Sequence, residues 1–283
     1  MWETAGPPPP SGPSVGRYGL AVGITVFVIV SQYFLPQSVP ALQPLYTSLA
    51  GDLFVVYGIP ILAFLGLVGA GPLRHWSQRM RVATVQGLAW FGALEVLSVL
   101  VVLVLTVVYL AVDPSALGLL SRQNPALTQA MGAPWFFVGL SFAIGAVEET
   151  IFRGWLFGFW MGRGGSWLFP AVWTSVLFAG VHLYYGTTYG IVAPLIFPTL
   201  FFTGFAFAAT FRASGGNLVV VALLHGVFDA SAFLTLISPD GGLALRYGVV
   251  LVGLVIAVVL WAQHAEPPTR PPIPAGDADR FPR

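Results

Sequence analysis

The sequence contains no cysteine and no lysine, and only 8% of its 283 residues are charged. The absence of cysteine excludes disulfide bonds, thiol catalysis and cysteine-ligated metal centres. Soluble domains usually carry about 25% charged residues, and no soluble fold of this length could bury a chain that is 57% hydrophobic. The net charge of +1 and the lack of a basic stripe with interleaved aromatic residues argue against nucleic acid as a partner. We therefore expect a protein whose solvent is the lipid bilayer.

Apolar runs separated by short breaks occupy most of the chain, and a membrane-spanning helix needs about 20 apolar residues. The predicted spans are residues 18–35, 52–70, 86–111, 134–160, 167–185, 190–211, 217–237 and 243–263. Pro60 in the second span, and Pro194 and Pro198 in the sixth, predict kinks or breaks. The fold class is therefore an all-α, polytopic transmembrane helix bundle with about eight spans.

Proline-rich segments flank this bundle at both ends of the chain. Residues 1–17 and residues 264–283 are rich in proline, so we expect two disordered tails. The transmembrane helical domain would extend over residues 18–263. The residues that carry the chemistry fall in its second half, within residues 134–237. No internal repeat relates the two halves, which argues against an inverted-repeat transporter.

Arginine placement predicts the orientation of the bundle, because cytoplasmic loops are enriched in basic residues. On the side that holds both tails lie Arg17, Arg74, Arg79, Arg81, Arg163, Arg212, Arg270, Arg280 and Arg283. Only Arg122 and Arg246 fall to the other side. The pattern predicts a multi-pass protein of the cell membrane with both termini in the cytoplasm.

Several ionisable side chains lie at mid-bilayer depth in the predicted spans, where each costs at least about 2.5–3.5 kcal/mol on insertion scales. They are Glu95, Glu148, Glu149, Arg153, His182, His225 and Asp229. All except Glu95 lie on the fourth, fifth and seventh spans, so convergence on one internal cavity is the economical explanation. Glu95 has no motif partner, and we predict that it lies near polar groups of the bundle.

The two adjacent glutamates are not equivalent. Glu149 and Arg153 are four residues apart, so they share one helix face and can form an ion pair. Glu148 lies about 100° around the helix from Glu149, so it is not the natural partner of Arg153. The spacing therefore predicts a structural role for Glu149 and leaves Glu148 free to take a proton from water.

Two histidines complete the cluster. His225 and Asp229 are also four residues apart, so Asp229 could accept a hydrogen bond from one ring nitrogen and leave the other for substrate or metal. His182 comes from a separate helix, one turn after Phe178. A buried ion pair or an interhelical hydrogen bond would explain any one of these residues alone, but not the joint set.

These spacings resemble a known family. Glu148 to Gly154 resembles the EExxxR motif of the CPBP family, which includes type II CAAX prenyl endopeptidases and bacteriocin-processing proteins. Phe178 to His182 is similar to that family's FxxxH motif, and His225 to Asp229 is similar to its Hxxx(N/D) motif. The resemblance covers residues 134–237 and implies a bundle of about eight helices with peptidase activity.

The resemblance also implies roles for the individual residues. Glu148 corresponds to the general base, acting with His182 to activate water. His225 and Asp229 correspond to the pair that stabilises the oxyanion, and Glu149 and Arg153 to a supporting ion pair. Prenyl endopeptidases typically carry Asn at the last position, and an ionised Asp229 cannot donate a hydrogen bond. Asp229 would then act through His225 or ligate a metal.

The sequence leaves the metal question open. Glu148, His182, His225 and Asp229 are donor types that Zn²⁺ accepts, but no HExxH helix is present. The alternative is a glutamate protease, in which Glu148 and His182 activate water unaided. No other cofactor is predicted.

The sequence thus predicts an intramembrane endopeptidase that cleaves a membrane-anchored or lipidated peptide entering sideways from the bilayer. One alternative is a non-catalytic peptide-binding or bacteriocin-immunity protein that uses the same cluster to hold its ligand. A proton-coupled transporter, in which the acids and histidines relay protons, is the other.

Overall fold

In the computed structural model, residues 14–31, 35–71, 73, 82–112, 132–161, 166–183, 193–234 and 237–265 are described. Within these ranges the regular structure is entirely helical, which confirms the predicted all-α class. The predicted tails fall mostly outside them, at residues 1–13 and 266–283. Four residues assigned to the N-terminal tail are described, and helix α1 already begins at Val15.

Each predicted span corresponds to a helix or a run of helices. These are α1 (Val15–Ser31), α4–η2–α5 (Leu49–Leu53, Phe54–Gly58 and Ile59–Leu67), α6 (Val82–Val112), α9–η5–α10 (Pro134–Glu149, Thr150–Phe157 and Gly158–Met161), α11 (Leu168–Val181), α13 (Ala193–Ala213), α14 (Leu218–Leu234) and α15 (Pro239–Ala265). Three short helices, α2 (Leu35–Ser38), η1 (Pro40–Leu42) and α3 (Gln43–Thr47), connect α1 to α4.

Among the described residues, four helices are long and apolar enough to cross a membrane. They extend over Leu49–Leu67, Val85–Val112, Pro134–Met161 and Asp240–Leu260. The apolar helices α1, α11 and α14 are shorter. The chain is therefore a helical membrane protein, while the count of eight spans and the orientation of the termini stay predictions.

Two spans depart from regular α-helical geometry. The second reaches Pro60 through the π-helical segment η2, so the irregularity lies just before the proline. The π-helical segment η5 begins directly after Glu149 and contains Arg153. π-Bulges frequently occur at functional sites. The sixth span, by contrast, continues as α13 through Pro198.

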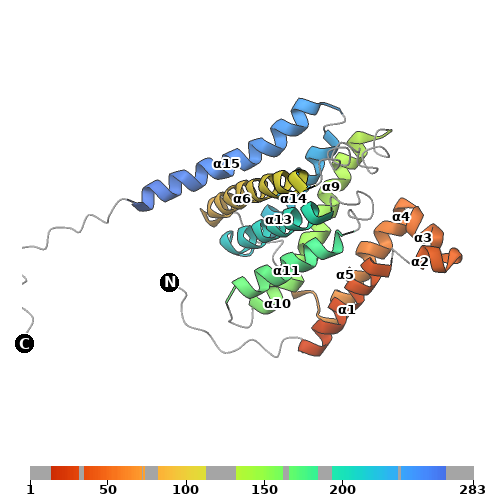
Figure 1. The fold of residues 1–283 in the computed structure, drawn as a ribbon. Helices are drawn as coiled ribbons and strands as arrows, with labels where there is room; N and C mark the ends of the chain where they lie inside the picture. Colours follow the sequence, from red (N-terminus) through yellow and green to blue (C-terminus); the bar gives the residue numbers. More distant parts are fainter. Residues whose placement is uncertain are drawn as a thin grey trace, which may run out of the picture.

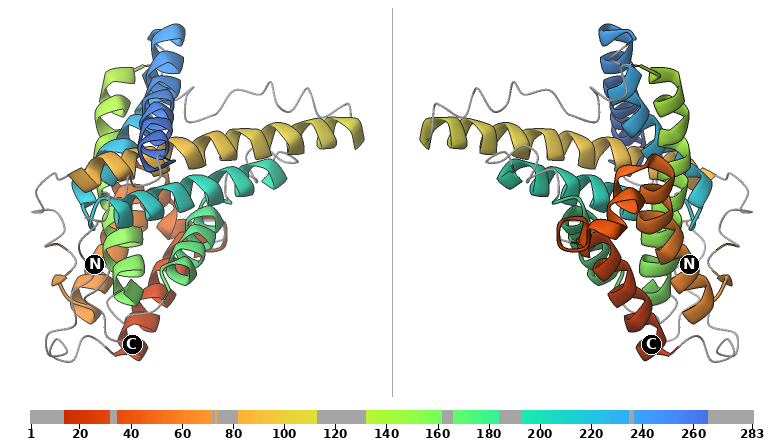
Figure 2. Two further views of the ribbon diagram at one scale, coloured as in Figure 1. Left: turned by 90° about the vertical axis from the view of Figure 1, so that its left-hand side faces the viewer. Right: turned by 90° about the vertical axis from the view of Figure 1, so that its right-hand side faces the viewer.

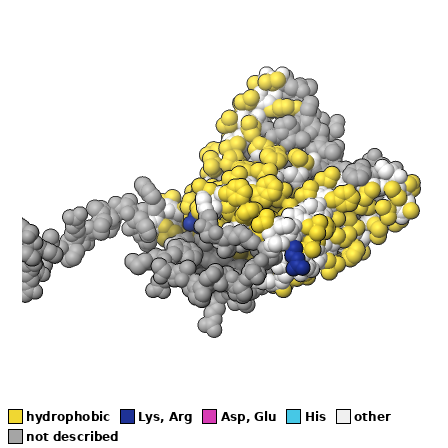
Figure 3. Space-filling model, turned by 90° about the horizontal axis from the view of Figure 1, so that it is seen from below, with side chains coloured by type: hydrophobic (Ala, Val, Ile, Leu, Met, Phe, Trp, Pro, Cys, Tyr) yellow, Lys and Arg dark blue, Asp and Glu magenta, His cyan; other side chains and the backbone are white. Residues whose placement is uncertain are grey.

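The helices pack as interlocked pairs (Figures 1 and 2). Helix α14 packs against α9, α13 against both α6 and α11, and α15 against α6. Helices α1 and α5 form a separate pair beside η5. Hydrophobic side chains cover most of the described surface seen in Figure 3, with arginine at only two places. Such a surface fits a lipid environment.

Close contact between α9 and α14 depends on glycines at their crossing. A Cβ atom added to Gly145 would lie 2.9 Å from the backbone nitrogen of Gly226. One added to Gly226 would lie 2.8 Å from Cα of Phe142. Because glycine has no Cβ, the two backbones meet here. This contact brings the first residues of the EExxxR and Hxxx(N/D) motifs close together.

Candidate active site

An ion pair anchors the site, and it is the pair that helix spacing predicts. Nη1 of Arg153 donates to Oε1 of Glu149 over 2.8 Å, and both side chains are fully buried. Nη2 of Arg153 donates to the backbone carbonyl of Gly204 on α13 over 2.6 Å. The guanidinium carbon lies 5.1 Å from the ring centroid of Phe178 and 5.3 Å from that of Phe207. Arg153 therefore ties η5 to α11 and α13.

Glu149 also contacts His225 on α14. The same Oε1 atom lies 2.8 Å from Nδ1 of His225, so the carboxylate accepts a hydrogen bond from this nitrogen. The ring of Phe207 stacks on the imidazole with a centroid distance of 4.8 Å. The sequence pattern gave His225 one carboxylate partner, Asp229, and Glu149 provides a second one at Nδ1. Asp229 lies on the opposite side of the ring, with Oδ2 3.4 Å from Nε2.

Glu148 projects away from the ion pair and toward the two histidines. Its Oε2 atom lies 3.8 Å from Nε2 of His182 and 3.7 Å from Nε2 of His225. This oxygen is buried and accepts no hydrogen bond from a described residue. Its other oxygen, Oε1, accepts a hydrogen bond of 3.0 Å from the hydroxyl of Tyr57 on η2. One oxygen of Glu148 is therefore held, and the other faces two imidazole nitrogens.

His182 directly follows the last residue of α11, rather than lying within a longer helix as the sequence predicts. Its Nδ1 atom lies 2.6 Å from the backbone carbonyl of Phe178. A carbonyl oxygen can only accept, so Nδ1 carries the proton and Nε2 of neutral His182 is an acceptor. This tautomer directs a lone pair toward Glu148.

The predicted residues Glu148, Glu149, Arg153, His182, His225 and Asp229 therefore meet at one place, where α9–η5, α11 and α14 converge. Glu95 is buried on α6 and takes no part in this set of contacts. It lies within electrostatic reach of Arg246. Its position near another polar group of the bundle agrees with the prediction.

Comparison with known protein families identifies the motif-bearing region. Residues 130–231 match the family described as type II CAAX prenyl endopeptidase Rce1-like. The resemblance of the three motifs to CAAX endopeptidases is confirmed. The match to the Rce1-like family covers about a third of the chain, from α9 into α14. No curated protein and no solved structure is significantly similar to the chain.

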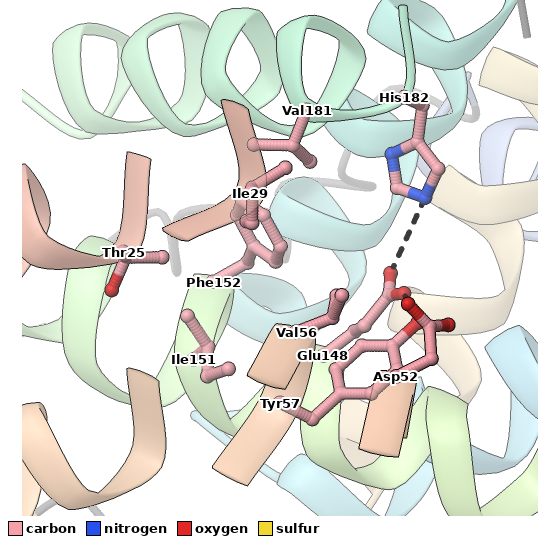
Figure 4. A pocket seen from close by; sticks show the side chains of 10 residues that line it. All are labelled: Thr25, Ile29, Asp52, Val56, Tyr57, Glu148, Ile151, Phe152, Val181 and His182. Carbon is pink, nitrogen blue, oxygen red and sulfur yellow. Dashed lines mark hydrogen bonds and ion pairs between the residues drawn. The ribbon is translucent and has the colours of Figure 1, made fainter. Parts of the chain in front are cut away.

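Two cavities flank Glu148, and both extend beyond the segment that matches the Rce1-like family. The larger, of ≈ 320 Å³, is lined by Glu148, both histidines and Asp229. The smaller, of ≈ 130 Å³, lies toward α1 and is shown in Figure 4. Glu148 and His182 line both cavities, so they form part of the wall between them.

Sequence reasoning missed two residues of this wall. Asp52 on α4 and Tyr57 on η2 also line both cavities, and Figure 4 shows their side chains beside Glu148. Asp52 is the first residue of the predicted second span. A carboxylate at the boundary of a predicted span is a sequence signal that could have indicated a site residue. Tyr57 carries no motif. Both residues lie outside the segment that matches the Rce1-like family.

Zinc binding at this cluster stays a prediction from the sequence. Among the described residues, no group of three His, Cys, Asp or Glu side chains is arranged to hold a metal ion. Glu148, His182, His225 and Asp229 have suitable chemistry, and their donor atoms follow one another at distances of 3.4–3.8 Å.

Proposed function

We propose that the chain is an intramembrane endopeptidase that hydrolyses a peptide bond with water activated by Glu148 and His182. The observation that carries this proposal is the position of Oε2 of Glu148. This buried oxygen lies 3.8 Å from Nε2 of His182 and 3.7 Å from Nε2 of His225, at the wall of a cavity. Separations of this size leave room for a bridging water.

The reaction begins with a water held by Glu148 and His182. The water donates one hydrogen to Oε2 of Glu148 and the other to Nε2 of His182, which the carbonyl of Phe178 keeps in the accepting tautomer. Its oxygen attacks the substrate carbonyl as Glu148 takes the proton, and a tetrahedral oxyanion forms. Glu148 then returns the proton to the leaving nitrogen, and the C–N bond breaks.

His225 is the group we assign to the oxyanion. Its ring lies between Glu149 on the Nδ1 side and Glu148 and Asp229 on the Nε2 side. As imidazolium it donates from Nδ1 to Glu149 and from Nε2 to the oxyanion. Before the oxyanion forms, Asp229 accepts a hydrogen bond from Nε2 of His225. This role requires no side-chain amide, so an Asp can take the place of the Asn that prenyl endopeptidases carry. Stabilisation by such a donor is commonly worth about 2.7–4 kcal/mol of barrier.

We infer that the substrate is a membrane-anchored or lipidated peptide. The hydrophobic face in Figure 3 fits a lipid environment, and the larger cavity combines the polar cluster with apolar side chains such as Leu140, Ile144 and Phe233. A peptide anchored in the bilayer would reach this cavity sideways. The family match supports peptidase chemistry and does not identify the peptide.

The test uses the full chain in lipid nanodiscs. The probes are a quenched-fluorescent farnesylated peptide ending in a CAAX sequence, its unlipidated form, and a peptide with an apolar membrane anchor. We expect Glu148→Gln, His182→Ala and His225→Ala each to lower kcat by at least about a hundredfold. Asp240→Asn, an exposed carboxylate at the start of α15, serves as the control and retains full turnover.

Unchanged turnover in all three variants would show that the assignment is wrong. Peptides that bind the wild-type protein and stay intact after long incubation would support the binding-protein alternative. Proton-driven flux across proteoliposomes without cleavage would support the transporter. To find the natural substrate, peptides that accumulate in cells expressing Glu148→Gln can be identified by mass spectrometry.

A further inference from the structure

Arg246 on α15 lines the same cavity as Glu148, His182 and His225. Helix α15 lies outside the segment that matches the Rce1-like family, so the motifs assign no role to this residue. Among the described residues that line the cavity, Arg246 is the one arginine. A permanent positive charge at the wall of a membrane cavity is costly to maintain and is by default functional.

The guanidinium of Arg246 lies over an aromatic ring and keeps its N–H donors. Its central carbon lies 4.1 Å from the ring centroid of Phe228, the residue that directly precedes Asp229 on α14. A guanidinium can stack on an aromatic ring and still present its N–H groups at its edges. No described residue forms a hydrogen bond or an ion pair with Arg246. The stacking contact thus holds the charge near one end of the polar cluster.

The acidic groups around Arg246 do not neutralise it by direct contact. Glu95 on α6 is buried and attracts Arg246 electrostatically without an ion pair. Asp52, Glu148 and Asp229 line the cavity, yet none forms an ion pair with Arg246. Glu95 therefore stabilises the charge without occupying its hydrogen-bond donors, which are available to a ligand.

We propose that Arg246 forms a carboxylate-binding subsite for the substrate peptide, in the same cavity as the hydrolytic residues. The planar guanidinium matches a carboxylate with two parallel hydrogen bonds. The carboxylate comes from either a free C-terminus or an Asp or Glu side chain of the peptide. This subsite rests on the proposed endopeptidase function, and it would set how far from the carboxylate the peptide is cut.

Binding is measured without turnover in full-length Glu148→Gln protein in nanodiscs. The probes are a fluorescent farnesylated peptide as the free acid, the same peptide as the C-terminal amide, and both forms with one internal Asp or Asn. We expect one type of carboxylate to increase affinity by at least about tenfold over its neutral counterpart. The increase disappears when Arg246→Ala is combined with Glu148→Gln. Arg246→Lys retains part of the increase, because lysine keeps the positive charge but lacks the two parallel N–H donors of the guanidinium.

Arg212 provides the matched control. Its guanidinium also lies over an aromatic ring, 4.6 Å from the centroid of Trp167, but it does not line the cavity. Arg212→Ala leaves the ratio of affinities for charged and neutral peptides unchanged. Thermal unfolding of each variant in the same nanodiscs shows whether the fold is retained.

Two results would overturn the subsite. One is equal affinity for charged and neutral peptides when Arg246 is present, and the other is an unchanged affinity ratio in Arg246→Ala. The failure of the endopeptidase function is seen separately, as the absence of cleavage by the wild-type chain despite a carboxylate preference in binding. Cleavage without any carboxylate preference leaves the endopeptidase intact and rejects the subsite alone.

Discussion

Nδ1 of His225 lies 2.8 Å from Oε1 of Glu149, the same oxygen that accepts from Arg153. The second glutamate of the EExxxR motif therefore does more than neutralise the arginine. It connects α9 to α14 and sets which nitrogen of His225 faces Glu148. The ion pair and His225, to which we assign the oxyanion, form one continuous polar network across α9, η5 and α14.

The hydroxyl of Tyr57 is predicted to orient the catalytic base, because it donates to Oε1 of Glu148 over 3.0 Å. Tyr57→Phe removes this hydrogen bond and keeps the ring. Hydrogen bonds to charged groups contribute about 1.5–3 kcal/mol, so we expect kcat to fall about tenfold or more. KM and the unfolding temperature should change little, because the substrate contacts and the packing of the ring remain.

Tyr46→Phe is the control for this prediction. The hydroxyl of Tyr46 bonds to Ser31 instead of to the polar cluster. Its removal should leave kcat unchanged. Equal losses of kcat in both variants, or a loss in Tyr57→Phe that appears only in KM, would argue against an orienting role.

Arg153→Ala is predicted to damage stability before catalysis can be examined. The change removes the arginine partner of the fully buried Glu149 and leaves the carbonyl of Gly204 without its donor. Breaking a buried ion pair on one side costs about 3–5 kcal/mol. Thermal unfolding in detergent, followed by circular dichroism, should show a large decrease in the unfolding temperature.

The double variant Glu149→Leu/Arg153→Met separates stability from function. Apolar replacement of both partners of a buried pair is often neutral or stabilising, so we expect part of the lost stability to return. Activity should stay absent, because His225 no longer has an acceptor at Nδ1. Recovery of full turnover in the double variant would show that Glu149 does not position His225.

Gly145→Ala is predicted to separate the two motif helices. The new methyl group would lie 2.9 Å from the backbone nitrogen of Gly226, and backbone cannot move aside cheaply. Overpacking of this kind costs about 1–3 kcal/mol. Gly139→Ala on the same helix meets nothing within 4 Å and should be neutral. Equal unfolding temperatures for Gly145→Ala and Gly139→Ala would contradict this prediction.

Metal removal is predicted to leave activity in place, because in the proposed reaction Glu148 and His182 activate the water without a metal. Purified wild-type protein is treated with 1,10-phenanthroline and dialysed. Its activity is then assayed with the intact probe peptide that the untreated protein cleaves. Elemental analysis of the same sample measures zinc. Stoichiometric zinc together with chelator-sensitive, zinc-restored turnover would establish the metalloprotease alternative.

The pattern of apolar residues was sufficient to predict a helical bundle, and helical spacing was sufficient to predict contacts within one helix. Apolar runs of spanning length predict helices because backbone groups in lipid must bond internally. The pairing of Glu149 with Arg153, rather than Glu148 with Arg153, follows from helical spacing and is seen in the structure. The family motifs, read in order, indicated the residues that converge from α9–η5, α11 and α14.

Contacts between helices depended on the tertiary structure. Spacing along α14 made Asp229 the natural partner of His225, but close packing of α9 on α14 at Gly145 and Gly226 places Glu149 nearer. Tyr57 and Arg246 carry no motif, and they reach the cavity only because η2 and α15 pack beside it. A one-dimensional pattern fixes which residues share a helix face, because the helical repeat is set by local hydrogen bonds. Which faces meet is decided by the packing of side chains from distant segments, and these contacts have no period in the sequence.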